Sequence, residues 1–256
     1  MSHTAETVLA RMPRRAPSPG QLASAKIVAH RGQRDGVHVR ENTFAAFDPV
    51  VTAGVAAIEF DVRYTRDDEP VVVHDADLNR VFGLADVIAD TSWKQLSRRA
   101  PTLPHLGDLR DRYAGRAHLM IELKTRGSTR GERRLLDHLQ GLTPAQDFHV
   151  LSLDTTLFAG AAGLDPRCYL PVAKLNLARL QRWALSHECA GLAGPYALLR
   201  PGHIRALQRA RGFVGSGFVT TAAVLLREIA RGVEWVFTNH PLRLQSALAA
   251  ARAETG

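Results

Sequence analysis

The sequence predicts a single α/β domain folded as a closed (β/α)8 barrel of the TIM type. Apolar runs alternate with amphipathic segments almost to the C-terminus, and eight such pairs fit into about 230 residues. No linker-like stretch divides the chain after its first residues. A doubly wound open sheet is the alternative. It is disfavoured because the turn after the first strand reads His30-Arg31-Gly32 and lacks a G-x-G-x-x-G fingerprint.

Strands are expected where β-branched and apolar residues run together, and helices where apolar residues recur every three or four positions. In the first half of the chain, we expect strands at 26–30, 57–64 and 118–124, with a short extended piece at 71–74. The helices expected there span 42–53, 92–98, 106–113 and 132–140, and Gly54 stops the first of them.

The second half of the chain continues the same alternation. Its expected strands are 148–153, 168–174, 190–193, 213–219 and 234–238. Its expected helices are 156–162, 177–187, 202–210, 222–230 and 242–251. Residues 26–256 therefore form the predicted barrel, and residues 1–25 are expected to be a flexible N-terminal arm without the apolar core of an export signal.

Composition limits the partners of the chain. The net charge of +8 comes mostly from arginines spread along the expected helices, without the concentrated basic stripe of a nucleic-acid binder. It favours a small anionic substrate. Cys168 and Cys189 lack metal-type spacing, which predicts reduced thiols and a cytoplasmic protein. No segment is apolar and long enough to span a bilayer, and the sequence leaves the oligomeric state open.

Charged residues end the first buried strands, where an unpaired charge would be costly. They are His30, Glu59, Asp61, Glu122 and Lys124. Barrel active sites lie at the carboxyl ends of the strands, so these side chains are expected at one mouth.

Alternation along the strands indicates which way these side chains point. Ile58 and Phe60 suit the barrel–helix interface, so Glu59 and Asp61 should face inward, as should Glu122. Three carboxylates of this kind suit one hard cation, Mg²⁺ or Ca²⁺, better than zinc.

Two histidines complete the candidate site. His30 ends the first strand, and His74 ends the extended piece 71–74. Because histidine titrates near neutral pH, such a pair can act as base and acid on opposite sides of a phosphoester. Arg31 could hold a phosphate oxygen, and Lys124 stands out because the chain has only four lysines.

These segments together resemble the glycerophosphodiester phosphodiesterase family. The matching pieces are His30-Arg31-Gly32, Glu41-Asn42-Thr43, Glu59-Phe60-Asp61-Val62, Thr65-Arg66-Asp67, Pro70 to Asp75 with Leu78 and Arg80, Pro101-Thr102-Leu103, Ile121 to Lys124, and Val236 to Pro241. The resemblance implies a (β/α)8 barrel that hydrolyses glycerophosphodiesters to glycerol 3-phosphate and an alcohol.

The resemblance also implies roles for individual residues. Glu59, Asp61 and Glu122 would hold one divalent cation, and His30 and His74 would be the acid–base pair. Arg31 and Lys124 would bind the phosphate, and Glu41 would line the same mouth.

Two departures from the family pattern bear on the substrate. Phe218-Val219-Thr220-Thr221 replaces a Trp-Thr-Val-Asn run, so Phe218 is expected to supply an apolar wall. The stretch from His74 to Pro101 is short and leaves the mouth open to a bulkier alcohol group. Two alternatives therefore stay open: a lysophospholipase D-like enzyme acting on lipid diesters, and a catalytically idle barrel that binds phosphate-bearing ligands.

Overall fold

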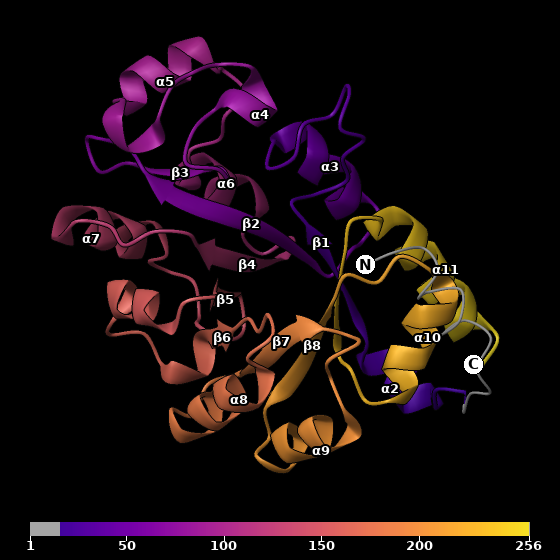
Figure 1. Cartoon of the computed structure of the whole chain (residues 1–256). Helices are drawn as coiled ribbons and strands as arrows, with labels where there is room; N and C mark the ends of the chain where they lie inside the picture. Colours follow the sequence, from indigo (N-terminus) through magenta and orange to yellow (C-terminus); the bar gives the residue numbers. More distant parts are fainter. Residues whose placement is uncertain (1–15, 256) are drawn as a thin grey trace.

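Eight parallel strands lie side by side in chain order and close into a barrel (Figure 1), which confirms the predicted fold. The structure is a computed structural model that describes residues 16–255. The barrel strands are β1 (Lys26–His30), β2 (Ala57–Tyr64), β4 (His118–Leu123), β5 (Phe148–Ser152), β6 (Tyr169–Pro171), β7 (Gly191–Pro195), β8 (Phe213–Gly217) and β9 (Trp235–Thr238). A further strand, β3 (Pro70–Val72), pairs antiparallel with β2.

The seam between β6 and β7 is held by fewer backbone contacts than the ladders between the other barrel strands. A bridge joins Val172 to Ala193, and the amide of Ala173 donates to the carbonyl of Ala193 at 2.7 Å. The amide of Val172 donates to Ser152 of β5, so alternation turns the nitrogen of Pro171 toward β7. Proline has no N–H, which removes one ladder bond at this seam and explains why β6 is shorter than the predicted strand 168–174.

Helices surround the barrel (Figure 1). They are α3 (Phe44–Thr52), α6 (Leu106–Tyr113), α7 (Thr129–His138), α8 (Leu177–Ser186), α9 (Pro201–Arg209), α10 (Ala222–Ala230) and α11 (Pro241–Ala253). The prediction of an α-helix at 156–162 was wrong in type, because the connection there is the 3₁₀ helix η2 (Thr155–Ala161). Gly160 packs so closely on Glu132 of α7 that a Cβ would lie 2.7 Å from its carboxylate.

The stretch after His74 forms a small appendage beside the barrel (Figure 1). It contains α4 (Asn79–Phe82), the 3₁₀ helix η1 (Ile88–Asp90) and α5 (Trp93–Arg99). Its apolar side chains pack into a separate cluster with β3, formed by Val71, Val73, Leu78, Ile88, Leu96, Ala100 and Leu103. The remaining short 3₁₀ helix, η3 (Pro166–Cys168), precedes β6.

The packed part of the chain begins before the first strand. Helix α2 (Pro19–Ser24) is capped by Ser18 and contacts α10 and α11, with Leu22 buried. The prediction that residues 1–25 form a flexible arm was therefore wrong for residues 19–24, which form this packed helix. Residues 1–15 of that arm lie outside the described residues.

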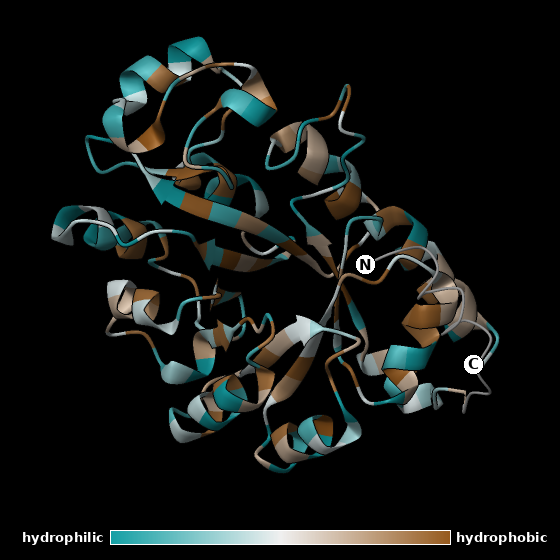
Figure 2. Ribbon diagram, viewed as in Figure 1, coloured by the Kyte–Doolittle hydropathy of each residue, from teal (hydrophilic) through white to brown (hydrophobic). Residues whose placement is uncertain are grey.

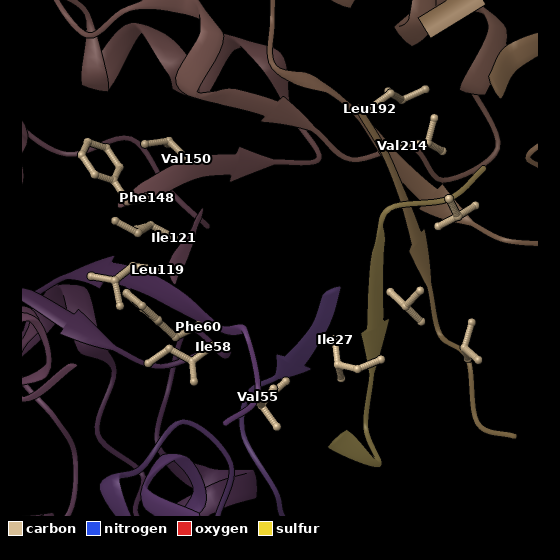
Figure 3. Packing of buried hydrophobic residues seen from close by; sticks show 14 of the residues in the cluster. Ile27, Val55, Ile58, Phe60, Leu119, Ile121, Phe148, Val150, Leu192 and Val214 are labelled. Carbon is tan, nitrogen blue, oxygen red and sulfur yellow. The ribbon is translucent and has the colours of Figure 1, made fainter. Parts of the chain in front are cut away.

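Alternating residues of the strands build two apolar layers. Side chains that face the helices, such as Ile58, Phe60, Ile121 and Val150, form the larger core (Figure 3). A smaller inward cluster fills the barrel and includes Val28, Met120, Leu151, Trp235 and Phe237. Helices carry hydrophobic and hydrophilic residues on the same ribbon (Figure 2), as one-sided packing requires. The inward cluster is the floor on which polar residues at the strand ends rest.

Among residues 16–255, the longest apolar helical stretches are too short to cross a membrane.

Candidate active site

The structure brings the three predicted carboxylates together at the carboxyl end of the barrel. Glu59 and Asp61 extend inward from β2, and Asp61 pairs in register with Glu122 of β4. One oxygen of each lies within 4.8 Å of the others, and all three residues are buried. We call Glu59, Asp61 and Glu122 the carboxylate trio.

Two cationic side chains contact the trio. The Lys124 ammonium pairs with Asp61 Oδ1 at 2.9 Å and also with Glu122. Arg31 Nε lies 3.0 Å from Asp61 Oδ2, and its Nη1 donates to Glu41. Burial alone would raise the pKa of Asp61, but Lys124 and Arg31 hold that pKa below its usual value. Asp61 is therefore a carboxylate with two fixed cations.

The negative charge of the Glu59 carboxylate has fewer partners than that of Asp61. Its Oε2 accepts the backbone N–H of Arg31 at 3.1 Å, while Oε1 is buried without a hydrogen-bond partner among the described residues. Burial and the neighbouring charges of Asp61 and Glu122 raise the pKa of Glu59 well above its usual value. An unpartnered buried oxygen beside two other carboxylates calls for a positive partner, so these residues fit a divalent metal.

The backbone turn after β1 aims Arg31 at the trio. Arg31 has a φ of +59° and Gly32 a φ of +82°. A Cβ on Gly32 would lie 2.7 Å from Ala46 of α3, so only glycine permits this close approach. Asn42, also at positive φ, donates its side-chain amide to Asp61 Oδ2 at 2.7 Å just before Thr43 caps α3. The predicted helix start at Asn42 therefore belongs to the site.

His30 is buried and held in one tautomer. Its Nδ1 lies 2.8 Å from Asn239 Oδ1, and that oxygen also accepts Arg34 Nη2 at 3.0 Å. Because Asn239 Oδ1 is an acceptor, the His30 Nδ1 carries the proton and its Nε2 presents a lone pair. Burial, followed by the charge of Arg31, lowers the pKa of His30 to about 4. His30 is thus neutral near pH 7, with Nε2 3.9 Å from Glu59.

His74 has a different environment. Its Nδ1 lies 2.7 Å from the carboxylate of Asp75, which Arg80 holds from the other side at 2.6 Å. Partial burial lowers the pKa of His74, and the Asp75 carboxylate opposes that shift. A carboxylate partner stabilises a protonated imidazole, which an amide partner cannot do to the same degree. The two histidines are therefore chemically distinct.

Glu41 lies behind the site. Its carboxylate accepts from Arg31 at 3.0 Å and Arg80 at 2.6 Å and pairs with Arg34 at 3.3 Å. Those cations hold the pKa of Glu41 below its usual value despite burial. Glu41 is not among the residues that line the cavity at this end of the barrel.

A cavity of about 570 Å³ opens at this mouth. His30, Arg31, Glu59, His74, Glu122 and Lys124 line one side of it. The other side is mostly apolar and comes from the second half of the barrel, through Leu151, Leu153, Val172, Leu175, Phe218 and Phe237. We call this second set the apolar wall. Phe218 sits edge-on to His30 with ring centroids 4.8 Å apart, so the predicted wall residue reaches the polar side.

A second cluster, Glu69, His105 and His138, has a weaker claim to a metal. His105 Nδ1 accepts the backbone N–H of Gly107 at 3.1 Å. The proton of a neutral His105 therefore sits on Nε2, 3.2 Å from Glu69, and blocks the nitrogen that a cation would need.

Sequence reasoning missed Arg34 and Asn239 as site residues, and it did not pair Asp75 with His74. Asn239 follows β9 and meets β1 only because the last and first strands pair. Asn239 lies in the segment Val236 to Pro241, which is part of the family resemblance and could have indicated a site residue. No pattern near Arg34 indicated a role for Arg34.

Comparison with known proteins agrees with this geometry. Residues 30–140 match the glycerophosphoryl diester phosphodiesterase family. The matched region contains both histidines, the carboxylate trio, Arg31 and Lys124. Through these residues, which make up less than half of the chain, it is similar to the glycerophosphoryl diester phosphodiesterase family. The apolar wall lies outside the matched region.

Individual relatives share parts of the chain. A glycerophosphodiester phosphodiesterase of Bacillus altitudinis is 31% identical over 114 residues, which is 40% of this chain and 46% of that protein. A lysophospholipase D of Rattus norvegicus is 39% identical over 69 residues, 27% of this chain and 21% of its own. The chain thus spans less than half the length of these curated relatives.

Solved structures of a glycerophosphodiester phosphodiesterase and of another phosphodiesterase share the fold. That of Thermotoga maritima superposes with a TM-score of 0.74 at 21% identity, covering 88% of this chain and 98% of its own. That of Oleispira antarctica, in complex with the product sn-glycerol-3-phosphate, gives 0.73 at 22% identity, covering 88% and 96%.

Proposed function

We propose that the protein is a divalent-cation-dependent phosphodiesterase that hydrolyses glycerophosphodiesters to glycerol 3-phosphate and an alcohol. The observation that carries the proposal is the convergence of both histidines and the carboxylate trio on one cavity mouth. The family match over the residues that build this mouth supports it.

The charge of the mouth favours one divalent cation, Mg²⁺ or Ca²⁺. The trio, when ionised, exceeds the charges of Lys124 and Arg31 by one negative unit. A bound divalent cation reverses that sign, and a monoanionic phosphodiester then completes the balance. When bound by Glu59, Asp61 and Glu122, the cation supplies Lewis-acid stabilisation of charge on the phosphate and on the attacking oxygen.

Arg31 and Lys124 are the proposed phosphate ligands. Both line the cavity beside the trio, and both are held by carboxylates. Arg31 presents a planar set of donors that suits phosphate oxygens, while Lys124 offers a compact charge. Phe218, whose ring contacts the His30 ring, would exclude water from His30.

The different partners of the two Nδ1 atoms support a division of the proton transfers between the histidines. His30 Nε2 is unprotonated and takes the proton from the attacking oxygen, which is either water or a neighbouring glycerol hydroxyl. His74, in the protonated form that the Asp75 carboxylate stabilises, donates the proton on its Nε2 to the oxygen of the departing alcohol. After attack by water, proton exchange with solvent restores both histidines. After attack by the hydroxyl, water opens the resulting cyclic phosphate while His74 takes a proton from that water and His30 returns its proton to the glycerol oxygen.

A substrate panel tests the proposal. The purified protein is incubated with glycerophosphocholine, glycerophosphoethanolamine and lysophosphatidylcholine, each with Mg²⁺, Ca²⁺ or EDTA, and released glycerol phosphate and choline are measured. We expect cation-dependent hydrolysis of at least one diester. Binding of these ligands without turnover would instead favour the idle phosphate-binding barrel.

The apolar wall favours a second candidate within the same chemistry, a lysophospholipase D-like activity on lipid diesters. Leu175 is 91% exposed and Phe218 49% exposed at the cavity mouth, where an acyl-bearing group could contact them. The 39% identity to a lysophospholipase D over 69 residues also supports this candidate.

Replacing Leu175 of the apolar wall by serine separates the two substrate classes. If the wall contacts an acyl group, kcat/KM for lysophosphatidylcholine should fall about tenfold, because apolar contacts worth 1–3 kcal/mol are lost. Hydrolysis of glycerophosphocholine should change much less. Leu185→Ser, on an exposed apolar side chain away from this cavity, is the control. Equal losses on both substrates would exclude a lipid-specific wall.

A cytoplasmic location is part of the proposal. Cys168 and Cys189 are free thiols, and burial raises the pKa of both to about 12. Such unreactive thiols suit a reducing compartment. Cell fractionation with detection of the native protein tests this location, and recovery in the exported fraction would contradict it.

A further inference from the structure

A continuous chain of polar contacts joins the two histidines behind the cavity. It connects the Nδ1 atoms, which face away from the reacting groups. Its steps are His30 to Asn239, Asn239 to Arg34, Arg34 to Glu41, Glu41 to Arg80, Arg80 to Asp75, and Asp75 to His74, with distances of 2.8, 3.0, 3.3, 2.6, 2.6 and 2.7 Å. Neither Arg34 nor Arg80 has a role in the proposed chemistry.

Arg80 is the step that links the appendage to the barrel. It lies on α4, and its Nε donates to Asp75 while its Nη2 donates to Glu41. Two separate nitrogens of one planar guanidinium thus reach two carboxylates. A lysine ammonium is a single point and cannot reproduce this spacing.

We propose that Arg80 is a positioning residue for His74, because it fixes the Asp75 carboxylate against Glu41 at the place where Asp75 receives the His74 Nδ1–H. His74 then keeps its Nε2 toward the cavity that it lines. The inference rests on the proposed function, in which His74 is the proton donor.

A simple surface ion pair is the competing interpretation, since half of the Arg80 side chain is exposed and exposed pairs stabilise little. The partners argue otherwise. Glu41 is 7% exposed and keeps Arg31 and Arg34 when Arg80 is removed, so its charge stays compensated and the fold should survive. Asp75 loses the guanidinium that orients it. Loss of Arg80 should therefore affect catalysis more than stability.

The test combines kinetics with NMR of the histidine rings. Arg80→Ala should lower kcat for the best diester about 10- to 100-fold with little change in KM, as expected for loss of a group that orients a catalytic residue. The hydrogen-bonded Nδ1–H signal of His74 should weaken or vanish in ¹H–¹⁵N imidazole spectra, and Tm should stay near the wild-type value. Arg98→Ala, on the exposed side of α5, should change none of these.

Two further variants make the result specific. Arg80→Lys should not restore kcat, whereas millimolar methylguanidinium should partly restore it in Arg80→Ala. Asp75→Asn should lower kcat similarly, and adding Arg80→Ala to it should cause little further loss, since both act through one contact. Wild-type kcat with an unchanged His74 signal in Arg80→Ala, or fully additive losses in the double variant, would overturn the inference.

The outcomes separate this inference from the proposed function. If the wild-type protein hydrolyses no diester, the proposed function fails, and the NMR signal of His74 in Arg80→Ala still reports whether Arg80 positions the ring. If the wild type is active and Arg80→Ala matches it in kcat and spectrum, the positioning role alone fails.

Discussion

Replacing His30 by alanine should lower kcat/KM for glycerophosphodiesters by about 10²- to 10⁴-fold, the range for loss of a general base. The neutral ring, with its proton on Nδ1 and its lone pair on Nε2, is the group that accepts a proton in our account. Alanine removes that lone pair. The Tm should stay nearly unchanged, because the Arg34 bonds to the His30 carbonyl and to Asn239 survive.

His149 offers a matched control. It also faces into the barrel, but from the opposite end, where its Nδ1 lies 2.7 Å from His118 Nε2 and its ring contacts Phe213 and Trp235. His149→Ala should lower Tm and spare activity, which is the reverse of His30→Ala. If His30→Ala unfolds the protein and its remaining folded fraction is fully active, His30 is a structural histidine and the assignment is wrong.

The alternation of β2 explains why so much of this site could be predicted from the sequence. Ile58 and Phe60 fill the layer under the helices, which leaves Glu59 and Asp61 no place except inside the barrel. A charged residue at the end of a buried strand is rarely explained by packing alone, because burying an unpaired charge is costly. The same reasoning placed His30, Glu122 and Lys124 at the mouth.

The outer partners of the histidines could not be predicted in the same way. Asn239 reaches His30 across 209 positions of sequence, through the pairing of β9 with β1 that closes the barrel. In the sequence, Arg34 and Arg80 look like the many solvated arginines of this chain. Their contacts with Glu41, and with Asn239 and Asp75 respectively, exist only in the fold. The close packing of Gly160 in η2 on Glu132 of α7 is likewise a tertiary contact that the sequence pattern does not indicate.

Glu59→Gln should stabilise the cation-free protein while abolishing most of its activity. In the folded protein Glu59 is buried, has one unpartnered oxygen and faces Asp61 and Glu122. Glutamine removes that repulsion, which we expect to raise the free energy of unfolding by about 1 kcal/mol and Tm by 2–4 °C. Activity should fall at least about a hundredfold, because several kcal/mol of cation-derived charge stabilisation is lost.

The sign of the pH dependence follows from the raised pKa of Glu59. The folded state binds this proton more tightly than the unfolded state does, so the stabilisation from the protonated form is complete below the unfolded pKa. It is lost as pH rises through the folded value. Thermal unfolding of the cation-free wild type should therefore show stability falling as pH rises across that window, and the slope should be smaller in Glu59→Gln.

Glu228→Gln is the matched control for a buried glutamate. Glu228 is also fully buried with a raised pKa, but Arg231 donates to both of its oxygens at 2.7 and 2.8 Å. Its replacement should destabilise the protein and leave the response to a divalent cation intact. A Glu59→Gln variant that is less stable than the wild type without cation, yet gains as much Tm from the cation, would contradict a metal role for Glu59.

The central claim is that this mouth hydrolyses a phosphodiester with the help of a cation held by the carboxylate trio. The most direct measurement is the rate of glycerol phosphate release from glycerophosphocholine and its relatives by protein first treated with EDTA and then titrated with Mg²⁺ or Ca²⁺. We predict negligible release after EDTA, recovery that saturates with one of the two ions, and loss of that recovery in Glu59→Gln. Release that is unaffected by EDTA, or no release from any diester at any cation concentration, would contradict the account.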